Sequence, residues 1–196
     1  WQGGSAVPYW RTPAACAVGG TDGAQFRPHL RAHERVQLWL PEARRAVPLR
    51  VAAAGVFRHV HVYRFQLVDS VLANASEAPA QAAFEQLALP HGALNISAVC
   101  DGAPIFLSRP HFLGADAWFG AAIGGMRPRA GAHESFLDVE PESGVTLRAR
   151  ERLQWNVLVG GAPLAAGARE RALVPLYWRE RAAAATLAQA DRVQDA

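Results

Sequence analysis

The sequence predicts a mainly β fold of antiparallel strands, with short helices and long loops. Two segments carry this prediction. From Val145 to Val159 apolar and polar residues alternate, which is the period of a strand with one buried face. From Val60 to Val68 β-branched and aromatic residues dominate, and these residue types favour strands. Glycine and proline separate such segments, as expected where turns join strands.

The remaining elements follow from shorter signals. Residues 1–34 are rich in glycine and proline and predict turns, and residues 70–92 predict loop or short helix. Further strands are expected at Val36–Leu40, Pro104–Ser108, Ser135–Glu140 and Leu173–Trp178. Ala117–Ile123 predicts two helical turns, and the alanine-rich segment Glu180–Ala190 predicts a helix. At 196 residues, the chain has the size of one domain.

The segment Val145–Val159 predicts a long, half-buried strand. Its apolar face holds Val145, Leu147, Ala149, Leu153, Trp155, Val157 and Val159, and only Glu151 interrupts it. The opposite face carries Arg148, Arg150 and Arg152, about 6–7 Å apart along the strand. Guanidinium groups suit phosphate and carboxylate partners. The stripe is therefore either a solvated face balanced by nearby acids or a weak contact site for anionic lipid or lipoprotein.

Composition excludes several kinds of chemistry. All 20 basic residues are arginine and the net charge is +3. Without lysine, the chain has neither a phosphate-loop lysine nor a Schiff-base lysine. The arginines alternate with acids and alanines, as in Arg148–Arg152, and this pattern argues against nucleic acid as a partner.

The sequence predicts no catalytic residue, metal site or cofactor. Ser108, His111 and Asp116 lie within nine residues of one turn, too close in sequence to converge as a triad. Two histidine pairs, His29 with His33 and His59 with His61, lack the further ligands that a metal requires. The same-face carboxylates Asp138 and Glu140 are interpreted as a strand end before Pro141 rather than as an acid–base pair.

The chain lacks an apparent signal peptide at Trp1 and has no apolar run long enough for a membrane helix. It has two cysteines, Cys16 and Cys100, which allow at most one internal disulfide. Two glycosylation sequons occur, Asn74-Ala-Ser76 and Asn95-Ile-Ser97. A cell can glycosylate them only in a secretory compartment.

Several segments together resemble the distal half of the ectodomain of the class B scavenger receptors. The most specific are Cys100–Asp116, which contains Pro-His-Phe-Leu-Gly-Ala-Asp, and His133–Gly144, which contains Leu-Asp-Val-Glu-Pro-Glu-Ser-Gly. Thr21–Phe26, Tyr63–Phe65 and Val174–Trp178 are similar to further family segments, so the resemblance covers nearly the whole chain.

The resemblance implies a membrane glycoprotein of the plasma membrane or lysosomal membrane, with this chain on the extracellular or lumenal side. Residues 1–196 would form part of a larger β-barrel with an internal lipid tunnel, and residues 180–192 a juxtamembrane helix. Asn74 and Asn95 would carry glycans. The implied function is binding of lipids, lipoproteins or anionic phospholipid and conduction of lipid. The alternative is a trafficking receptor for a lysosomal hydrolase, bound through a proximal half outside this chain. A hydrolase is the least supported function.

The cysteines depart from the family pattern. Ala43 stands where a usual disulfide partner would be, and the 77–91 loop has no cysteine. Either Cys16 and Cys100 pair with each other, or both are free. Their pairing would close a loop of about 85 residues and stabilise the fold by about 4 kcal/mol in the chain-entropy model.

Overall fold

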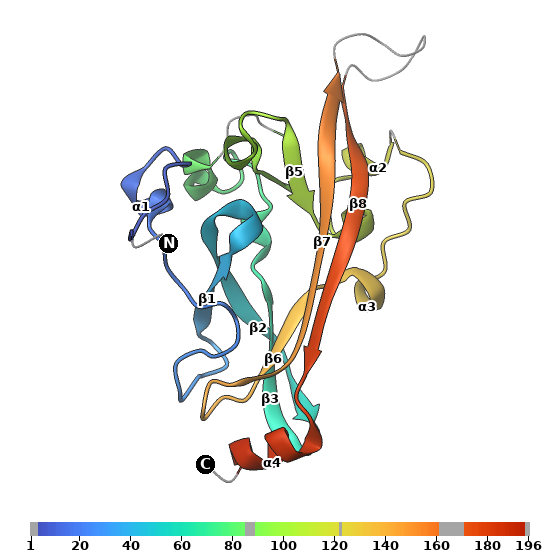
Figure 1. Cartoon of the computed structure of the whole chain (residues 1–196). Coiled ribbons are helices and arrows are strands. Elements are labelled where there is room, and N and C mark those ends of the chain that lie inside the picture. Colours follow the sequence, from blue (N-terminus) through green and yellow to red (C-terminus); the bar gives the residue numbers. More distant parts are fainter. Residues whose placement is uncertain (1–3, 85–88, 122, 161–170, 195–196) are drawn as a thin grey trace.

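The computed structural model describes residues 4–84, 89–121, 123–160 and 171–194. These residues form one sheet of eight strands in which every strand pairing is antiparallel, with short helices around it (Figure 1). The predicted mainly β class is therefore confirmed. The strands are β1 (Arg35–Leu40), β2 (Arg45–Phe57), β3 (Val60–Leu67), β4 (Ala93–Asn95), β5 (Ile105–Ser108), β6 (Phe136–Val139), β7 (Thr146–Gly160) and β8 (Arg171–Ala184).

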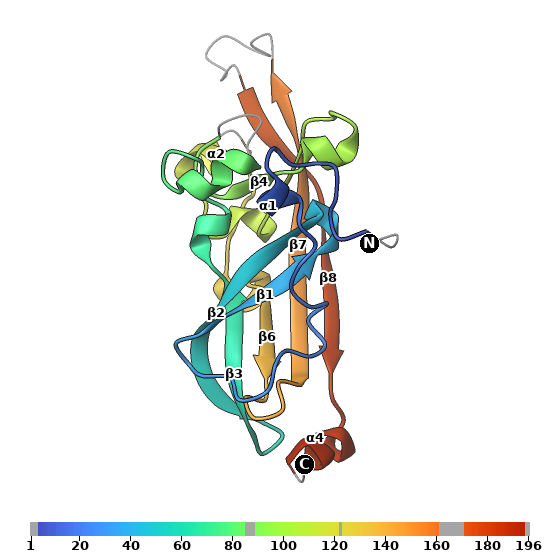
Figure 2. The same cartoon turned by 90° about the vertical axis from the view of Figure 1, so that its left-hand side faces the viewer.

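Short helices connect and flank the strands. The α-helices are α1 (Pro13–Cys16), α2 (Ala117–Ala121), α3 (Ala130–His133) and α4 (Leu187–Gln194). Short 3-10 helices are η1 (Pro41–Ala43), η2 (Asp69–Val71), η3 (Pro79–Ala83), η4 (Ser97–Cys100) and η5 (Pro110–Phe112). Figure 2 shows α4 at one end of the sheet, with α1 and α2 toward the other. The helix predicted in Ala117–Ile123 is confirmed over Ala117–Ala121 and is shorter than the two turns expected, while residue 122 lies outside the described residues. The short helix predicted in 70–92 is confirmed by η3.

Strand β7 organises the sheet, because three strands pair with it. Its first part, Thr146–Arg150, pairs with β6, and its later part, Gln154–Val157, pairs with β5 on the same side. The other side pairs with β8 over the whole of β7 from Arg148. The sheet order is β1-β2-β3-β6-β7-β5-β4, with β8 beside β7. Among the described residues, strands β1, β4 and β8 each pair with a single strand, so the sheet is not closed.

The sequence did not predict β2, although this strand pairs with both β1 and β3. It contains Pro48, three consecutive alanines at 52–54 and Gly55, residue types that are depleted in strands. The ladder shifts register between Val51 and Ala53, as in a β-bulge. Pairing on both sides compensates for the weak intrinsic preference of these residues.

The β7 prediction is correct for the strand and wrong for the burial of its faces. Gln154 and Asn156 on the polar face are 2% and 0% exposed, whereas the apolar neighbours Leu153 and Trp155 are only partly buried. Asn156 Nδ2 donates to Phe106 O and Ser108 Oγ, and Gln154 Nε2 donates to Asn156 Oδ1. These hydrogen bonds allow the amides to be buried.

The helix predicted from Glu180 begins later in the structure. Residues 180–184 belong to β8 and pair with Arg148–Arg152 of β7, and α4 starts only at Leu187. Alanine has a high helix propensity, but the ladder with β7 overrides it here. The predicted juxtamembrane helix over residues 180–192 is therefore strand in its first part.

Candidate functional site

A groove of about 510 Å³ lies between the β1–β3 strands and the β6–β8 strands. Most of its lining is apolar and comes from both strand groups: Leu38, Leu40, Val47, Leu49, Phe65, Leu67, Leu137, Ala149, Leu153, Ala182 and Ala183. Part of this wall belongs to two packed core clusters, one around Leu40 and Val47 and one around Leu49 and Phe65. The volume falls within the range of small-molecule sites, about 300–1,000 Å³.

The predicted apolar face of β7 contributes directly to the groove. Ala149, Glu151 and Leu153, three alternate residues of that face, all line it. Glu151, which interrupts the apolar pattern, accepts a hydrogen bond from Arg179 at 2.9 Å and lies 3.8 Å from Arg181. Arg181 also lines the groove. The groove thus combines an apolar wall with paired charges, as expected of a site for an amphipathic molecule.

The arginine stripe on β7 is paired with acids from the neighbouring strands. Arg148 Nε donates to Asp138 Oδ2 at 2.7 Å, and Arg150 Nη1 donates to Glu180 Oε1 at 3.1 Å. Arg152 binds the other oxygen of Glu180 and is 9% exposed. The structure therefore favours a charge-balanced face, and Arg152 is not available at the surface.

The pairing leaves an excess of positive charge on this face. Asp138 binds both Arg64 and Arg148, and Glu180 binds both Arg150 and Arg152. Two carboxylates thus serve four guanidinium groups. The side chains of Arg148 and Arg150 remain 32% and 39% exposed, so an anionic group can approach them.

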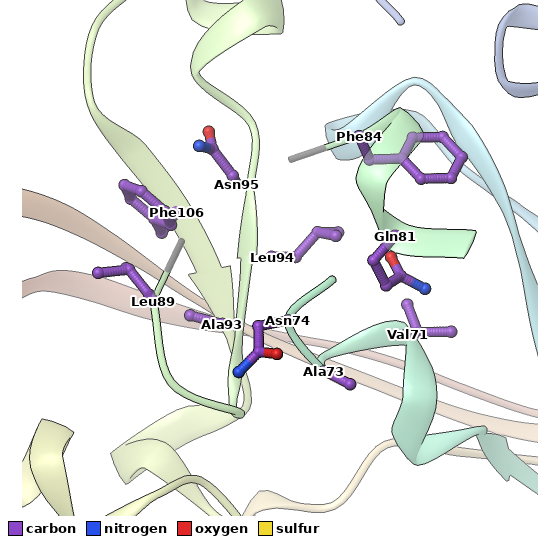
Figure 3. A pocket seen from close by; sticks show the side chains of 10 residues that line it. All are labelled: Val71, Ala73, Asn74, Gln81, Phe84, Leu89, Ala93, Leu94, Asn95 and Phe106. Carbon is purple, nitrogen blue, oxygen red and sulfur yellow. The ribbon is translucent and has the colours of Figure 1, made fainter. Parts of the chain in front are cut away.

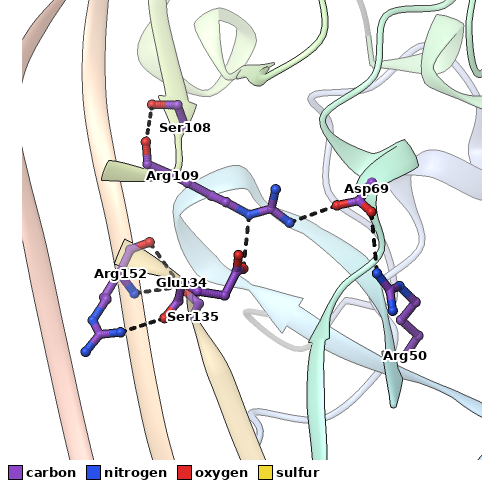
Figure 4. A network of polar contacts seen from close by, with 7 residues as sticks. All are labelled: Arg50, Asp69, Ser108, Arg109, Glu134, Ser135 and Arg152. Carbon is purple, nitrogen blue, oxygen red and sulfur yellow. Dashed lines mark hydrogen bonds and ion pairs between the residues drawn. The ribbon is translucent and has the colours of Figure 1, made fainter. Parts of the chain in front are cut away.

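A second polar network, which the sequence did not reveal, joins distant segments (Figure 4). Arg109, just before η5, donates to Asp69 Oδ1 in η2 at 3.1 Å and pairs with Glu134 after α3 at 3.1 Å. Asp69 also binds Arg50 of β2. Desolvation alone would raise the pKa of Asp69, but the hydrogen bond and charge of Arg109 outweigh it, and the net shift is downward. The network ties Arg109 and Glu134 to η2 and, through Asp69, to β2.

The two sequon asparagines line one small cavity of about 20 Å³ (Figure 3), which has room for about one water molecule. Asn74 Oδ1 accepts hydrogen bonds from the backbone and hydroxyl of Ser76. Asn95 in β4 is 8% exposed, and its Oδ1 accepts from Ser97 N at 2.8 Å. A glycan on Asn95 needs its amide nitrogen to turn outward, so glycosylation at both positions stays a prediction.

Cys16 and Cys100 are free thiols in the structure, so the disulfide between them is not formed. Cys16 Sγ donates to Trp10 O at 3.1 Å and packs with Val7, Trp10 and Ala15. Cys100 packs instead against the cluster around Ile96 and Leu107. Desolvation, with the Asp101 charge, raises the pKa of the Cys100 thiol, which disfavours the reactive thiolate.

The residues considered for catalysis or metal binding have separate local partners. Ser108 Oγ donates to Arg109 O, His111 Nδ1 accepts from Arg127 N, and Asp116 Oδ1 accepts from Trp118 N. His29 pairs with Glu142, and His59 with Asp191. Asp138 binds arginines, and Glu140 accepts from Glu142 N and Ser143 N. Within the described ranges, no three histidine, cysteine or carboxylate side chains group as metal ligands.

An open antiparallel sheet with an apolar groove defines a β-rich protein with a site suited to an apolar ligand. The model of the CD36 family matches residues 1–195, and the chain belongs to this family. It is 34% identical over 159 residues to lysosome membrane protein 2 of Rattus norvegicus, covering 81% of this chain and 33% of the relative. It is 32% identical over 186 residues to scavenger receptor class B member 1 of Cricetulus griseus, covering 94% and 36%. The predicted resemblance is confirmed.

The chain spans about a third of the length of these curated relatives. In the described part of the chain, no helix is both long and apolar enough to cross a membrane.

Proposed function

We propose that this chain is the distal part of the ectodomain of a class B scavenger-receptor-like membrane glycoprotein that binds lipids or lipoproteins. Its groove would form one wall of a lipid-conducting tunnel, which strands from outside this chain would close. The protein would sit in the plasma membrane or the lysosomal membrane, with this chain on the extracellular or lumenal side, and would act as a receptor rather than an enzyme.

The observation that carries the proposal is the apolar groove between the β1–β3 strands and the β6–β8 strands. The half-buried part of the lining, which includes Leu38, Leu67, Leu137 and Leu153, costs free energy while it faces water, about 25 cal/mol per Å² of apolar surface. An acyl chain or a sterol would remove that surface from water. Arg150 and Arg181, which also line the groove, complement a carboxylate or phosphate headgroup.

The direct test is equilibrium binding of a fluorescent fatty acid and of a sterol to the complete ectodomain. Saturable binding that unlabelled lipid displaces is the expected result. Absence of saturable binding for both ligand classes would defeat lipid transfer.

The alternative is a trafficking receptor that escorts a lysosomal hydrolase. The identity to a lysosome membrane protein favours this function. Pull-down of lysosomal hydrolases by the full-length protein at neutral and acidic pH separates the two functions. Capture at neutral pH with release in acid supports the escort, and no capture at either pH removes it.

A further inference from the structure

Two imidazole rings stack on each other between η5 and α3. The ring centroids of His111 and His133 lie 4.4 Å apart with an interplanar angle of 17°. His133 is 4% exposed. On its side toward β8 it meets the ring of Trp178, at 5.9 Å and 70°. The stack therefore joins three segments that are far apart in sequence.

Both rings accept a backbone hydrogen bond from the segment that leads into α3. His111 Nδ1 accepts from Arg127 N at 3.3 Å, and His133 Nδ1 accepts from Arg129 N at 3.1 Å. A nitrogen that accepts a hydrogen bond carries no proton, so these contacts select the neutral ring with its proton on Nε2. Protonation of Nδ1 turns each acceptor into a donor that faces another donor.

The surroundings of the stack oppose a positive charge. The positive charges of Arg129, in the same segment, and of Arg152, in β7, both disfavour protonation of His133. Arg152 is held next to the stack by its hydrogen bond to Glu134 O at 2.7 Å. The nearby carboxylates are already engaged, Glu180 of β8 by Arg152 and Glu134 by Arg109. In the described ranges, the histidines that pair with a carboxylate are His29, His59 and His91.

The backbone beside the stack is in an unfavourable conformation, which favours release of the stack. His111 and Phe112 both have positive φ angles, 54° and 56°, which residues other than glycine adopt rarely. The amide of His111 donates to Gln154 Oε1 at 2.9 Å, which helps to hold this conformation. Releasing the stack allows these two residues to relax.

We propose that the His111–His133 stack is an acid-sensitive latch that holds residues 127–134 against η5 and β8 at neutral pH and releases them on acidification. Burial, and then the charges of His111, Arg129 and Arg152, lower the pKa of His133. The released state therefore binds protons more readily than the closed one. Closure is favoured above the ordinary histidine pKa of about 6.5 and weakens as pH falls through the lowered value. This inference does not depend on lipid binding.

The test is amide hydrogen–deuterium exchange of the full chain at about pH 7.5 and about pH 5, the range in which histidine titrates. Protection factors, corrected for the intrinsic effect of pH, are compared between residues 129–134 and the amides of β7. We expect protection of 129–134 to fall several-fold in acid while β7 stays unchanged.

Variants separate the latch from a general effect of acid. His133→Asn places an amide oxygen near the Nδ1 position and cannot titrate, so its protection should not depend on pH. His29→Asn, at an exposed histidine that also has positive φ, should respond as the wild type does. Equal protection of the wild type at both pH values overturns the proposal, as does an undiminished response in His133→Asn. If that variant does not fold, His133→Gln, which cannot titrate either, is judged by the same two outcomes.

Discussion

Arg64 of β3 binds Asp138 of β6 through two parallel hydrogen bonds, Nε to Oδ1 at 2.7 Å and Nη2 to Oδ2 at 2.9 Å. The two residues are direct cross-strand partners, and Arg148 of β7 is the partner of Asp138 on its other side. The carboxylate is 1% exposed. One row across three strands thus places a buried anion between two arginines, and the sheet register creates this arrangement.

Replacing Asp138 by Asn should destabilise the fold by about 2 kcal/mol. The change removes the charge that both arginines share, and a broken buried pair costs about 3–5 kcal/mol. The guanidinium groups are about a third exposed, and water then offsets part of this loss. Denaturant unfolding measures the effect. Glu142→Gln, in an exposed pair with His29, should stay within about 0.5 kcal/mol; equal losses for both variants would contradict this account.

The Glu180–Arg152 pair should support the β7–β8 ladder down to mildly acidic pH. The hydrogen bond from Arg152, followed by the charges of Arg152 and Arg150, lowers the pKa of Glu180. A carboxylate whose pKa is lowered on folding contributes stability above its unfolded pKa of about 4.3, and this contribution disappears as pH falls through the folded value.

The melting temperature of Glu180→Gln, measured against the wild type from about pH 3 to pH 7, checks this expectation. The deficit should be constant above about pH 5 and should vanish in stronger acid. Glu77→Gln, whose carboxylate lies 3.7 Å from His91 and is half exposed, serves as the control and should show a small deficit. A Glu180→Gln deficit that persists at the acid end would show that the charge is not responsible.

The sequence predicted most strands because their signals are local. Alternation over Val145–Val159 and the β-formers of Val60–Val68 report burial within a single strand. Strand β2 starts with alternating Val47, Leu49 and Val51, but Pro48 and the alanines at 52–54 hide this signal. Residues 180–184 have no such alternation, and their alanines become strand through the ladder with β7. Local propensity cannot show a partner that lies many residues away.

The sequence identified the arginines of the site but not the acids that pair with them. It identified Arg148, Arg150 and Arg152 as a stripe, but the acids that bind them come from β6 and β8. Burial of Gln154 and Asn156 escaped prediction because their hydrogen-bond partners Phe106, Ser108 and His111 lie more than 40 residues away in sequence. The stacking of His111 on His133 likewise depends on how residues 109–134 fold back.

Filling the groove should weaken lipid binding if the groove is the lipid site. Ala149→Trp places a large side chain among Leu38, Leu153 and Ala183 and should weaken binding of a fluorescent fatty acid by about tenfold or more. Ala54→Trp, on an exposed position of β2 outside the groove lining, should bind as the wild type does. Equal affinity for all three proteins would place any lipid elsewhere.

Gly144 determines how the segment before β1 attaches to the sheet. Its φ is +75°, and a Cβ there would lie 2.5 Å from Arg27 O and closer still to Phe26 O. Phe26 N donates to Gly144 O at 2.8 Å, and the Phe26 ring stacks on Phe65. Phe65 and the nearby residues 22–24 line the groove, so this contact also positions one groove wall.

Gly144→Ala should therefore lower the free energy of unfolding by more than the positive φ at this position alone would explain. The left-handed conformation costs a residue with a Cβ about 1–2 kcal/mol, and the backbone clash must add to that because the 26–28 backbone has to shift to make room. Gly102→Ala provides the matched control, since Gly102 has φ +85° and a methyl group there would point into open space, with its nearest non-neighbouring atoms more than 4 Å away. Chemical unfolding should show a loss of about 1 kcal/mol for Gly102→Ala and at least twice that loss for Gly144→Ala. Equal losses would mean that the 22–28 segment can move aside, and the groove wall would then not depend on this turn.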